Sequence, residues 1–89
     1  MAGEGGGASE RIEVVMPRWG MEMQDGTIAR WLKQDGDRVA EGEVLAEVET
    51  DKVTAELKAP VSGTLAEIAV GQGDTVDVGG TVAVIRTGE

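Results

Sequence analysis

The chain has no cysteine and no histidine, and this removes most of the side-chain chemistry by which a small domain could catalyse a reaction alone. Without cysteine it can form neither a disulfide nor a protein thiolate. Without histidine it lacks the commonest general base and metal ligand. Ser9 and Ser62 therefore have no partner for nucleophilic catalysis. We expect neither a catalytic residue nor a metal site in this chain.

Positive charge and long apolar runs are also scarce. Eight lysines and arginines stand against 17 aspartates and glutamates, giving a formal charge of −9, and the basic residues are scattered. Nucleic acids are bound by clustered basic residues, so we expect no nucleic-acid partner. No apolar run has the length of a membrane span, and the first eleven residues resemble neither a secretion signal nor a transit sequence. We expect a cytoplasmic bacterial protein, or a mitochondrial matrix protein if the source is eukaryotic, without a membrane partner.

The length of 89 residues indicates one small domain. Residues 1–10 are glycine-rich and polar, so we expect a disordered leader there, followed by a domain over residues 11–87 and a tail or linker start at residues 88–89. No Gly-x-Gly-x-x-Gly run opens a helix, so nucleotide binding has no support. The aspartates could suggest a calcium site, but Gly-Asp turns explain their positions and the spacing of a calcium-binding loop is absent.

From Gly26 onward the sequence repeats itself at a constant spacing of thirty-seven residues. The repeated positions are Gly26/Gly63, Thr27/Thr64, Gly36/Gly73, Asp37/Asp74, Gly42/Gly79, Ala46/Ala83 and Thr50/Thr87. Each copy predicts a strand (27–32 and 64–69), a Gly-Asp turn, a very short strand at Val39 or Val76, a glycine turn and a long strand (44–50 and 81–86). A further strand should begin at Ile12 and end before Pro17.

Two copies of one β unit cannot each close a core, so we expect an all-β fold of two antiparallel sheets that face each other across a pseudo-twofold axis. The glycines at positions 26, 36, 42, 63, 73, 79 and 80 should serve positive φ angles or tight turns. Trp31 should be a core or partly buried sheet residue. The predicted core includes Ile28, Val39, Val44, Val48, Leu65, Val76 and Val82.

The segment from Glu47 to Leu57 predicts a β-hairpin with Asp51 and Lys52 at its corner. In that register Thr50 faces Val53, Glu49 faces Thr54, Val48 faces Ala55, Glu47 faces Glu56 and Ala46 faces Leu57. One face of the pair is then apolar and the other carries the glutamates, as a half-buried strand pair requires. Lys52 is presented at an outward corner with the carboxylates of Glu49, Asp51 and Glu56 nearby. Because Thr50 repeats as Thr87, the corner and the chain termini should lie at opposite ends.

Residues 16–25 form a loop with an unusual content of Trp19, Met21 and Met23. Two interpretations are open. These side chains could cap one end of a small barrel, or an exposed aromatic with adaptable methionines could form part of a partner-recognition surface.

These motifs together resemble the lipoyl domains of the biotin and lipoyl carrier family. The resemblance rests on the Asp51-Lys52 pair, the Ala-Pro-Val-Ser-Gly run at 59–63, a Met-Pro loop, a Gly-x-Ile strand, a Gly-Asp turn and a second glycine before the modified strand, and it covers residues 14–86. It implies a barrel-sandwich hybrid of two four-stranded sheets. It also implies that Lys52 is the lipoyl attachment site, with Asp51 and Val53 as flanking recognition residues. The residues implied in partner recognition are Trp19, Met21 and Glu22, with Glu49 and Glu56 in an acidic collar.

The resemblance further implies a carrier function, since the polypeptide has no redox or acyl-transfer chemistry of its own. Lipoic acid on Lys52 would take an acyl group from a thiamine-dependent 2-oxo acid decarboxylase (E1) to the acyltransferase (E2) and coenzyme A. Dihydrolipoamide dehydrogenase (E3) would reoxidise it, and a lipoate ligase would attach it. The expected parent is an acyltransferase subunit acting on pyruvate, acetoin or a branched-chain oxo acid, and the isolated domain should be monomeric.

Two alternatives stay open at this point. Biotin carboxyl carrier domains share the fold, but their sites resemble Ala-Met-Lys-Met, whereas Asp51 and Val53 flank the lysine here. An unmodified barrel-sandwich interaction module would leave the acidic corner at Lys52 unexplained.

Overall fold

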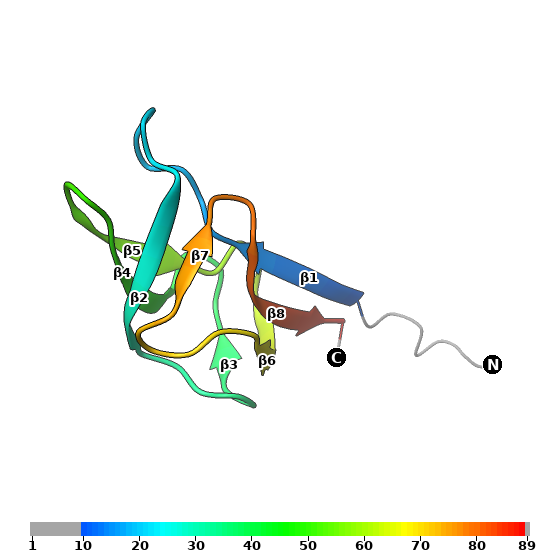
Figure 1. Ribbon diagram of the computed structural model, residues 1–89. Coiled ribbons are helices and arrows are strands. Elements are labelled where there is room, and N and C mark those ends of the chain that lie inside the picture. Colours follow the sequence, from blue (N-terminus) through cyan, green and yellow to red (C-terminus); the bar gives the residue numbers. More distant parts are fainter. Residues whose placement is uncertain (1–9, 89) are drawn as a thin grey trace.

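The computed structural model describes residues 10–88, which form eight strands in two four-stranded antiparallel sheets (Figure 1). One sheet has the order β1-β8-β6-β3 and the other β5-β4-β2-β7. The strands are β1 (Glu10–Val15), β2 (Asp25–Trp31), β3 (Arg38–Val39), β4 (Val44–Glu49), β5 (Thr54–Lys58), β6 (Gly63–Ile68), β7 (Thr75–Asp77) and β8 (Thr81–Thr87). Within residues 10–88 no helix is long and apolar enough to cross a lipid bilayer. The predicted all-β class with two four-stranded sheets is confirmed.

The internal symmetry predicted from the repeat is present in the hydrogen bonds. The Gly36 N–H donates to the Leu65 carbonyl at 2.7 Å, and the equivalent Gly73 N–H donates to the Ile28 carbonyl at 2.7 Å. Both Gly-Asp turns close in the same way: the carboxylates of Asp37 and Asp74 each accept a backbone N–H three residues upstream. The pseudo-twofold axis therefore relates β1–β4 to β5–β8 in order, and it maps one sheet onto the other.

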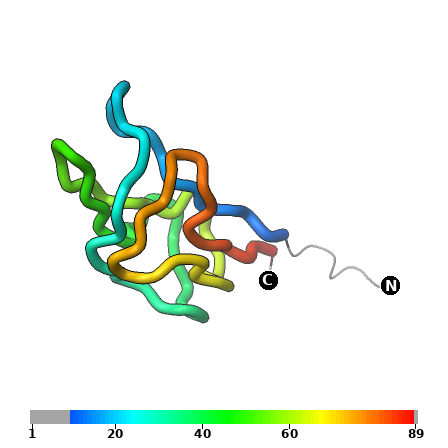
Figure 2. The backbone as a smooth tube through the Cα atoms, viewed as in Figure 1, coloured from blue at the N-terminus to red at the C-terminus, as the bar shows by residue number. Residues whose placement is uncertain are grey.

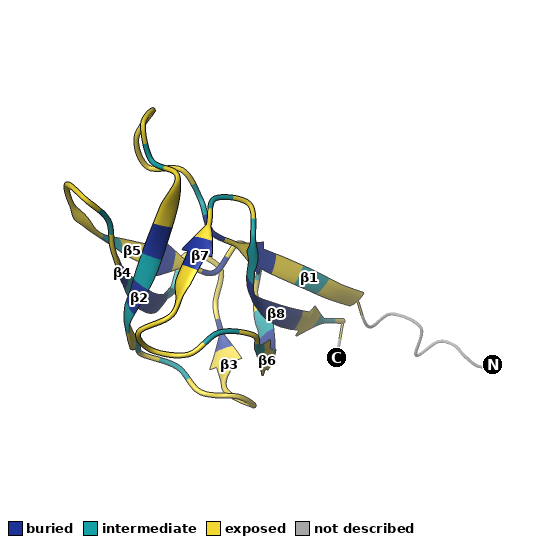
Figure 3. Ribbon diagram, in the orientation of Figure 1, coloured by how far each residue is buried: buried dark blue, intermediate teal, exposed yellow. Residues whose placement is uncertain are grey.

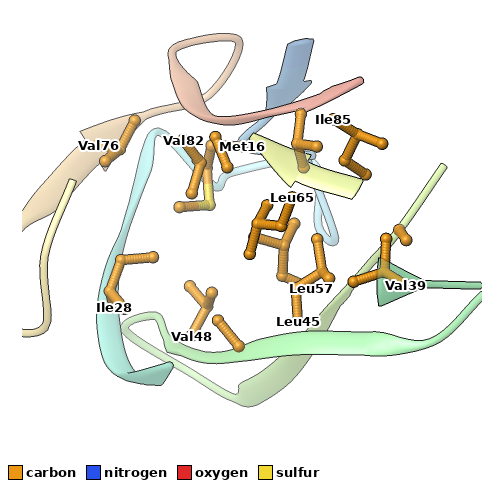
Figure 4. Packing of buried hydrophobic residues seen from close by; sticks show 14 residues of the cluster. Met16, Ile28, Val39, Leu45, Val48, Leu57, Leu65, Val76, Val82 and Ile85 are labelled. Atoms are coloured by element: carbon orange, nitrogen blue, oxygen red, sulfur yellow. The ribbon is translucent and has the colours of Figure 1, made fainter. Parts of the chain in front are cut away.

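A single apolar layer lies between the sheets and holds them together (Figure 4). Symmetry-related positions fill it in pairs, namely Ile28 with Leu65, Val39 with Val76, Leu45 with Val82, Ala46 with Ala83 and Val48 with Ile85. Each half supplies strands that are apolar on one side only, so neither half could bury its own core. Trp31 packs partly buried against this layer and donates its indole N–H to the Val70 carbonyl at 3.0 Å, as expected for a sheet residue.

The core prediction is wrong at one position. Val44 is only half-buried, whereas Leu45 and Ala46 are both fully buried. The cause is a shift of register between Val44 and Ala46 where β4 pairs with β5. Such a bulge breaks the strict alternation of inward and outward side chains on which the prediction depended.

The glycine prediction also needs a correction. Positive φ angles between 86° and 93° occur at Gly36, Gly42, Gly73 and Gly79. Gly26 and Gly63, which were also predicted to serve turns, lie within β2 and β6 and do not have positive φ angles. Gly26 is instead required for space, because a Cβ there would come within 2.7 Å of the Val48 side chain and 3.1 Å of the Met16 sulfur. Gly63 is similarly enclosed by the backbone of β8.

We expect Gly26→Ala to destabilise the fold by about 1–3 kcal/mol, because the added methyl group overpacks the interior. Gly20→Ala is the matched control: nothing lies within 4 Å of a Cβ at that position, so the change should stay within about 0.5 kcal/mol. Urea unfolding of the two variants measures both effects. Equal stability of the two variants would contradict the packing argument.

The observed strand bounds differ from the predicted ones by one or two residues at several ends. β1 starts at Glu10, which pairs with Thr87, so residue 10 belongs to the sheet. The leader predicted for the preceding nine residues lies outside the described part of the chain. The β4–β5 corner and the described ends of β1 and β8 lie on opposite sides of the molecule, as predicted from the symmetry (Figure 2).

The two halves differ in the connection that follows their first strand. Met16 and Ala59 make equivalent backbone bonds to Gly80 and Glu43, yet ten positions separate Met16 from Gly26 and only four separate Ala59 from Gly63. The β1–β2 loop is therefore longer by six residues. It projects on the side of the β4–β5 corner, away from the described ends of the chain (Figure 1).

Candidate functional site

The corner between β4 and β5 has the predicted register. Ala46 pairs with Leu57, Glu47 with Glu56, Val48 with Ala55, and Glu49 with Thr54. The Thr50 N–H then donates to the Val53 carbonyl at 2.9 Å, which leaves Asp51 and Lys52 as the two exposed corner residues. Val53 was expected on the apolar face of the hairpin, but its side chain is 53% exposed because the corner extends beyond the facing sheet.

The hydroxyl of Thr50 holds this corner, and sequence reasoning missed its role. It donates to the Val53 carbonyl at 2.9 Å and accepts the N–H groups of Val53 at 3.2 Å and Lys52 at 3.4 Å. No non-glycine residue between 10 and 88 has a positive φ, so the corner is not one of the primed turns that suit a two-residue hairpin. The three hydroxyl contacts therefore stabilise a turn that the strand twist alone does not favour. A threonine directly before a turn is the signal that could have identified it.

Lys52 projects from the corner with its side chain 77% exposed. Its Nζ forms an ion pair with the Glu22 carboxylate at 3.3 Å, so the partner comes from the β1–β2 loop. Glu49 and Glu56, predicted to lie near this amine, are exposed on β4 and β5 and do not supply the ion pair. A surface pair of this kind is weak, but it joins the long loop to the corner.

The β1–β2 loop is folded by Arg18, a second residue that sequence reasoning missed. The Arg18 guanidinium donates to the carbonyls of Met21 at 2.9 Å and Met23 at 3.0 Å. The loop also closes through the Met23 N–H, which donates to the Gly20 carbonyl at 3.1 Å. This fixed turn places Met21 and Glu22 at the tip of the loop.

An open groove of about 600 Å³ separates the loop from the corner. It is lined by residues 19–25 and 50–53, and we call it the corner groove. Three apolar side chains around it are exposed: Trp19 by 37%, Val53 by 53% and Met21 by 92%. The loop tip and the corner are correspondingly among the exposed regions in Figure 3.

The side chains of the loop divide into two groups: the cap interpretation fits Met23, while the partner-recognition role of Trp19 and Met21 stays a prediction. Met23 is partly buried and packs against the core, as a barrel cap would. Trp19 and Met21 do not cap the barrel and stay available at the surface. Glu56 lies in a separate groove between β1 and β5, which Trp19 also borders.

The other two lysines are presented differently. Lys33 forms an ion pair with Glu43 at 2.7 Å, and its side chain is only 25% exposed. The hydrogen bond to Glu43 and the charge of that carboxylate raise the pKa of Lys33, which disfavours the neutral amine that an acylation needs. Lys58 lies within β5, paired with Val44, and not at a corner. Lys52 is thus the lysine that a modifying enzyme can approach at a projecting turn.

The Lys33–Glu43 pair should make a small, pH-dependent contribution to stability. Hydrogen bonds from Lys33 and from the Ala40 N–H lower the pKa of Glu43. A lowered carboxyl pKa stabilises the fold above the ordinary value of 4.5, and this contribution is lost as the pH falls through the folded-state pKa. We therefore expect Glu43→Gln to lower the urea midpoint at neutral pH and to have no effect in strong acid. An equal effect at both pH values would contradict the ionic origin.

The site presents the Lys52 amine at a projecting corner, with the Glu22 carboxylate as its ion-pair partner. The sequence holds no thiol or imidazole. The residues fit a covalently attached apolar group: the Nζ of Lys52 projects beside an open groove with Trp19, Met21 and Val53 at its surface. A cofactor in amide linkage would supply the reactivity that the chain lacks.

Comparison with known proteins agrees with this geometry. The family model for biotin and lipoyl attachment, described as "Biotin-requiring enzyme", matches residues 12–85. The chain is 49% identical over 76 residues to the dihydrolipoyllysine-residue succinyltransferase component of the 2-oxoglutarate dehydrogenase complex from Bacillus subtilis, covering 85% of this chain and 18% of that protein. It is 50% identical over 74 residues to the dihydrolipoyllysine-residue acetyltransferase component of the pyruvate dehydrogenase complex from Corynebacterium glutamicum, covering 83% and 11% respectively.

A solved structure gives the same result at the level of the domain. The lipoyl domain of the 2-oxoglutarate dehydrogenase complex from Azotobacter vinelandii superposes with a TM-score of 0.67 at 37% identity, covering 85% of this chain and 95% of that one. The chain spans less than a fifth of the length of the two curated relatives. These similarities favour the lipoyl over the biotin alternative. The chain belongs to the biotin and lipoyl carrier family and is a lipoyl domain.

Proposed function

We propose that Lys52 carries lipoic acid in amide linkage and that the domain serves an acyltransferase subunit of a 2-oxo acid dehydrogenase complex. The observation that carries this proposal is the position of the Lys52 amine at a tight, exposed corner, beside a groove that no other lysine borders. Lipoate held there would supply a disulfide that can be reductively acylated; transfer of the acyl group to a thiol acceptor would leave a dithiol, which dihydrolipoamide dehydrogenase would reoxidise. Asp51 and Val53, exposed on either side of the lysine, are the proposed recognition contacts for a lipoate ligase.

The role of the protein residues is to hold and direct the lysine. Thr50 fixes the corner from which the side chain extends. The two sheets keep that corner away from the ends of β1 and β8, so that a domain linked to a larger subunit points its lysine outward (Figure 2). Tethering then keeps the carried group at a high effective concentration near each partner enzyme.

The proposed partners follow from the names of the relatives, which are acyltransferase components of pyruvate and 2-oxoglutarate dehydrogenase complexes. They are a thiamine-dependent decarboxylase (E1), the acyltransferase catalytic domain (E2), dihydrolipoamide dehydrogenase (E3) and a lipoate ligase. The negative charge of the domain, formally −9, would steer basic partner surfaces towards it and affect the association rate more than the affinity. The proposed recognition surface combines Trp19, Met21 and Glu22 beside the lysine with the exposed Glu49 on β4 and Glu56 on β5.

Reductive acylation tests this function. The lipoylated domain is incubated with purified 2-oxo acid decarboxylases and their substrates, and the acyl group on the domain is measured. One cognate decarboxylase should acylate it much more efficiently than the others. Failure of every decarboxylase to acylate a correctly lipoylated domain would contradict the proposed role.

Trp19→Ala should lower kcat/KM for reductive acylation about thirtyfold, the loss expected when an aromatic anchor of about 2 kcal/mol is removed from an interface. The fold should be retained, because Trp19 is outside the buried core. Leu32→Ala is the control, since it removes another exposed apolar side chain just beyond the opposite end of β2. Equal rates for both variants would remove Trp19 from the recognition surface.

A further inference from the structure

The corner groove has an apolar character that the fold does not require. Met21 is 92% exposed and Val53 is 53% exposed, and both border this groove together with Trp19. None of the three belongs to the buried core. An exposed methionine at a loop tip contributes little to folding, while its flexible, polarizable side chain suits contact with an apolar or sulfur-containing ligand.

In the unmodified protein, the charged side chain of Lys52 forms an ion pair across this groove. Lys52 Nζ lies 3.3 Å from the Glu22 carboxylate on the opposite side. Acylation of Nζ converts the ammonium into a neutral amide, so that this ion pair is lost and the two sides are no longer held by it. The same step adds an apolar chain at the edge of the groove.

We propose that the corner groove is an intramolecular docking site for the acyl arm on Lys52, and that the arm exchanges between a docked and a free state. This inference rests on the proposed function, because it takes the arm to be attached at that lysine. The acyl arm is the expected occupant because Lys52 itself lines the groove. A group attached to its Nζ is therefore tethered next to the apolar side chains of the same groove. A methylene chain ending in a dithiolane matches the lining by Trp19, Met21 and Val53.

The groove is open, so docking must be reversible. Its polar members, including Glu22, Asp25 and Asp51, leave only part of the lining for apolar contact. A tethered ligand needs little affinity to occupy such a site for much of the time, because its local concentration is high. A docked arm would lie against Trp19, so a partner enzyme that binds this loop would displace the arm towards its own active site.

The test compares three acyl groups placed on Lys52 of the full chain as preformed acyl-lysines. Acetyl removes the charge without adding an arm, octanoyl adds the arm without sulfur, and lipoyl adds both. Nuclear Overhauser effects are recorded between the arm protons and the protons of Trp19, Met21 and Val53. We expect contacts for octanoyl and lipoyl, with shifts of the Trp19 indole and Met21 methyl signals that acetyl does not produce.

Met21→Ser is the matched variant, because a side chain that is 92% exposed can be replaced without disturbing the core. It should lower the docked population about fivefold. Glu22→Gln should reproduce only the shifts that acetyl causes. Identical spectra for the acetyl, octanoyl and lipoyl proteins, or a docked population unchanged by Met21→Ser, would overturn the proposal.

The outcome is separable from a failure of the proposed function. The acyl groups are installed without a ligase, so docking is measured whether or not an enzyme modifies Lys52. A chain that docks a preinstalled arm but is never lipoylated would contradict the proposed function alone. A chain that is lipoylated on Lys52 but shows no arm contacts would contradict the docking site alone.

Discussion

Moving the lysine by one position is expected to abolish lipoylation while the fold is retained. The two variants exchange neighbours, one combining Asp51→Lys with Lys52→Asp and the other combining Lys52→Val with Val53→Lys. Each keeps the composition and the β4–β5 pairing, because the exchanged side chains are exposed. The amine, however, leaves position 52, the corner position whose backbone N–H donates to the Thr50 hydroxyl. Misplacement of a reacting group by about an ångström can cost about 10²-fold in rate.

The measurement is the initial rate of lipoylation by a lipoate ligase, followed by the mass of the intact protein. Lys33→Arg together with Lys58→Arg is the control, and it should be lipoylated at the unaltered rate, since neither side chain borders the corner groove. Circular dichroism and urea unfolding establish that the exchanged variants fold. Efficient lipoylation of either folded variant would show that the corner does not select the amine.

Loss of the Thr50 hydroxyl should have the second largest effect on lipoylation. Thr50→Val removes the donor to the Val53 carbonyl and the acceptor for two backbone N–H groups. A net loss of about 1–1.5 kcal/mol for such hydrogen bonds corresponds to about a tenfold lower population of the ordered corner. We expect kcat/KM for lipoylation to fall about tenfold, mainly through KM, because the chemistry at Nζ is unchanged.

Two further substitutions separate positioning from general destabilisation. Thr50→Ser keeps the hydroxyl and should restore most of the rate. Thr87→Val changes the symmetry-related threonine at the end of β8, which makes no equivalent turn, and should leave lipoylation unchanged. A Thr50→Ser protein as slow as Thr50→Val would contradict the assigned role of the hydroxyl.

The architecture could be predicted because two sequence patterns, the internal repeat and the alternation around Lys52, are compatible with few arrangements of the strands. The constant thirty-seven-residue spacing relates Gly36 to Gly73 and Asp37 to Asp74, and these residues close matching turns. The alternation of valines and glutamates around Lys52 allows only one hairpin register, because a slip by one residue would bury charge. The first pattern relates equivalent positions of the two repeats, and the second lies within a single hairpin.

The contacts that the sequence did not reveal are of a different kind. The Glu22–Lys52 ion pair joins residues thirty positions apart, and its formation depends on how Arg18 folds the β1–β2 loop. The equivalent connection in the other half is six residues shorter, so the symmetry gives no guide to the shape of this loop. The bulge at Val44 was missed because an extra residue in a strand leaves no mark in an apolar pattern.

The central claim is that the β4–β5 corner offers one amine, that of Lys52, for lipoylation. The most direct test incubates the protein with lipoate, ATP and a lipoate ligase, and separately with biotin, ATP and a biotin ligase, and then locates the added mass by peptide fragmentation. The account predicts one lipoyl group on Lys52, none on Lys33 or Lys58, and no biotin. An unmodified Lys52, a lipoyl group on either other lysine, or biotin on Lys52 would contradict it.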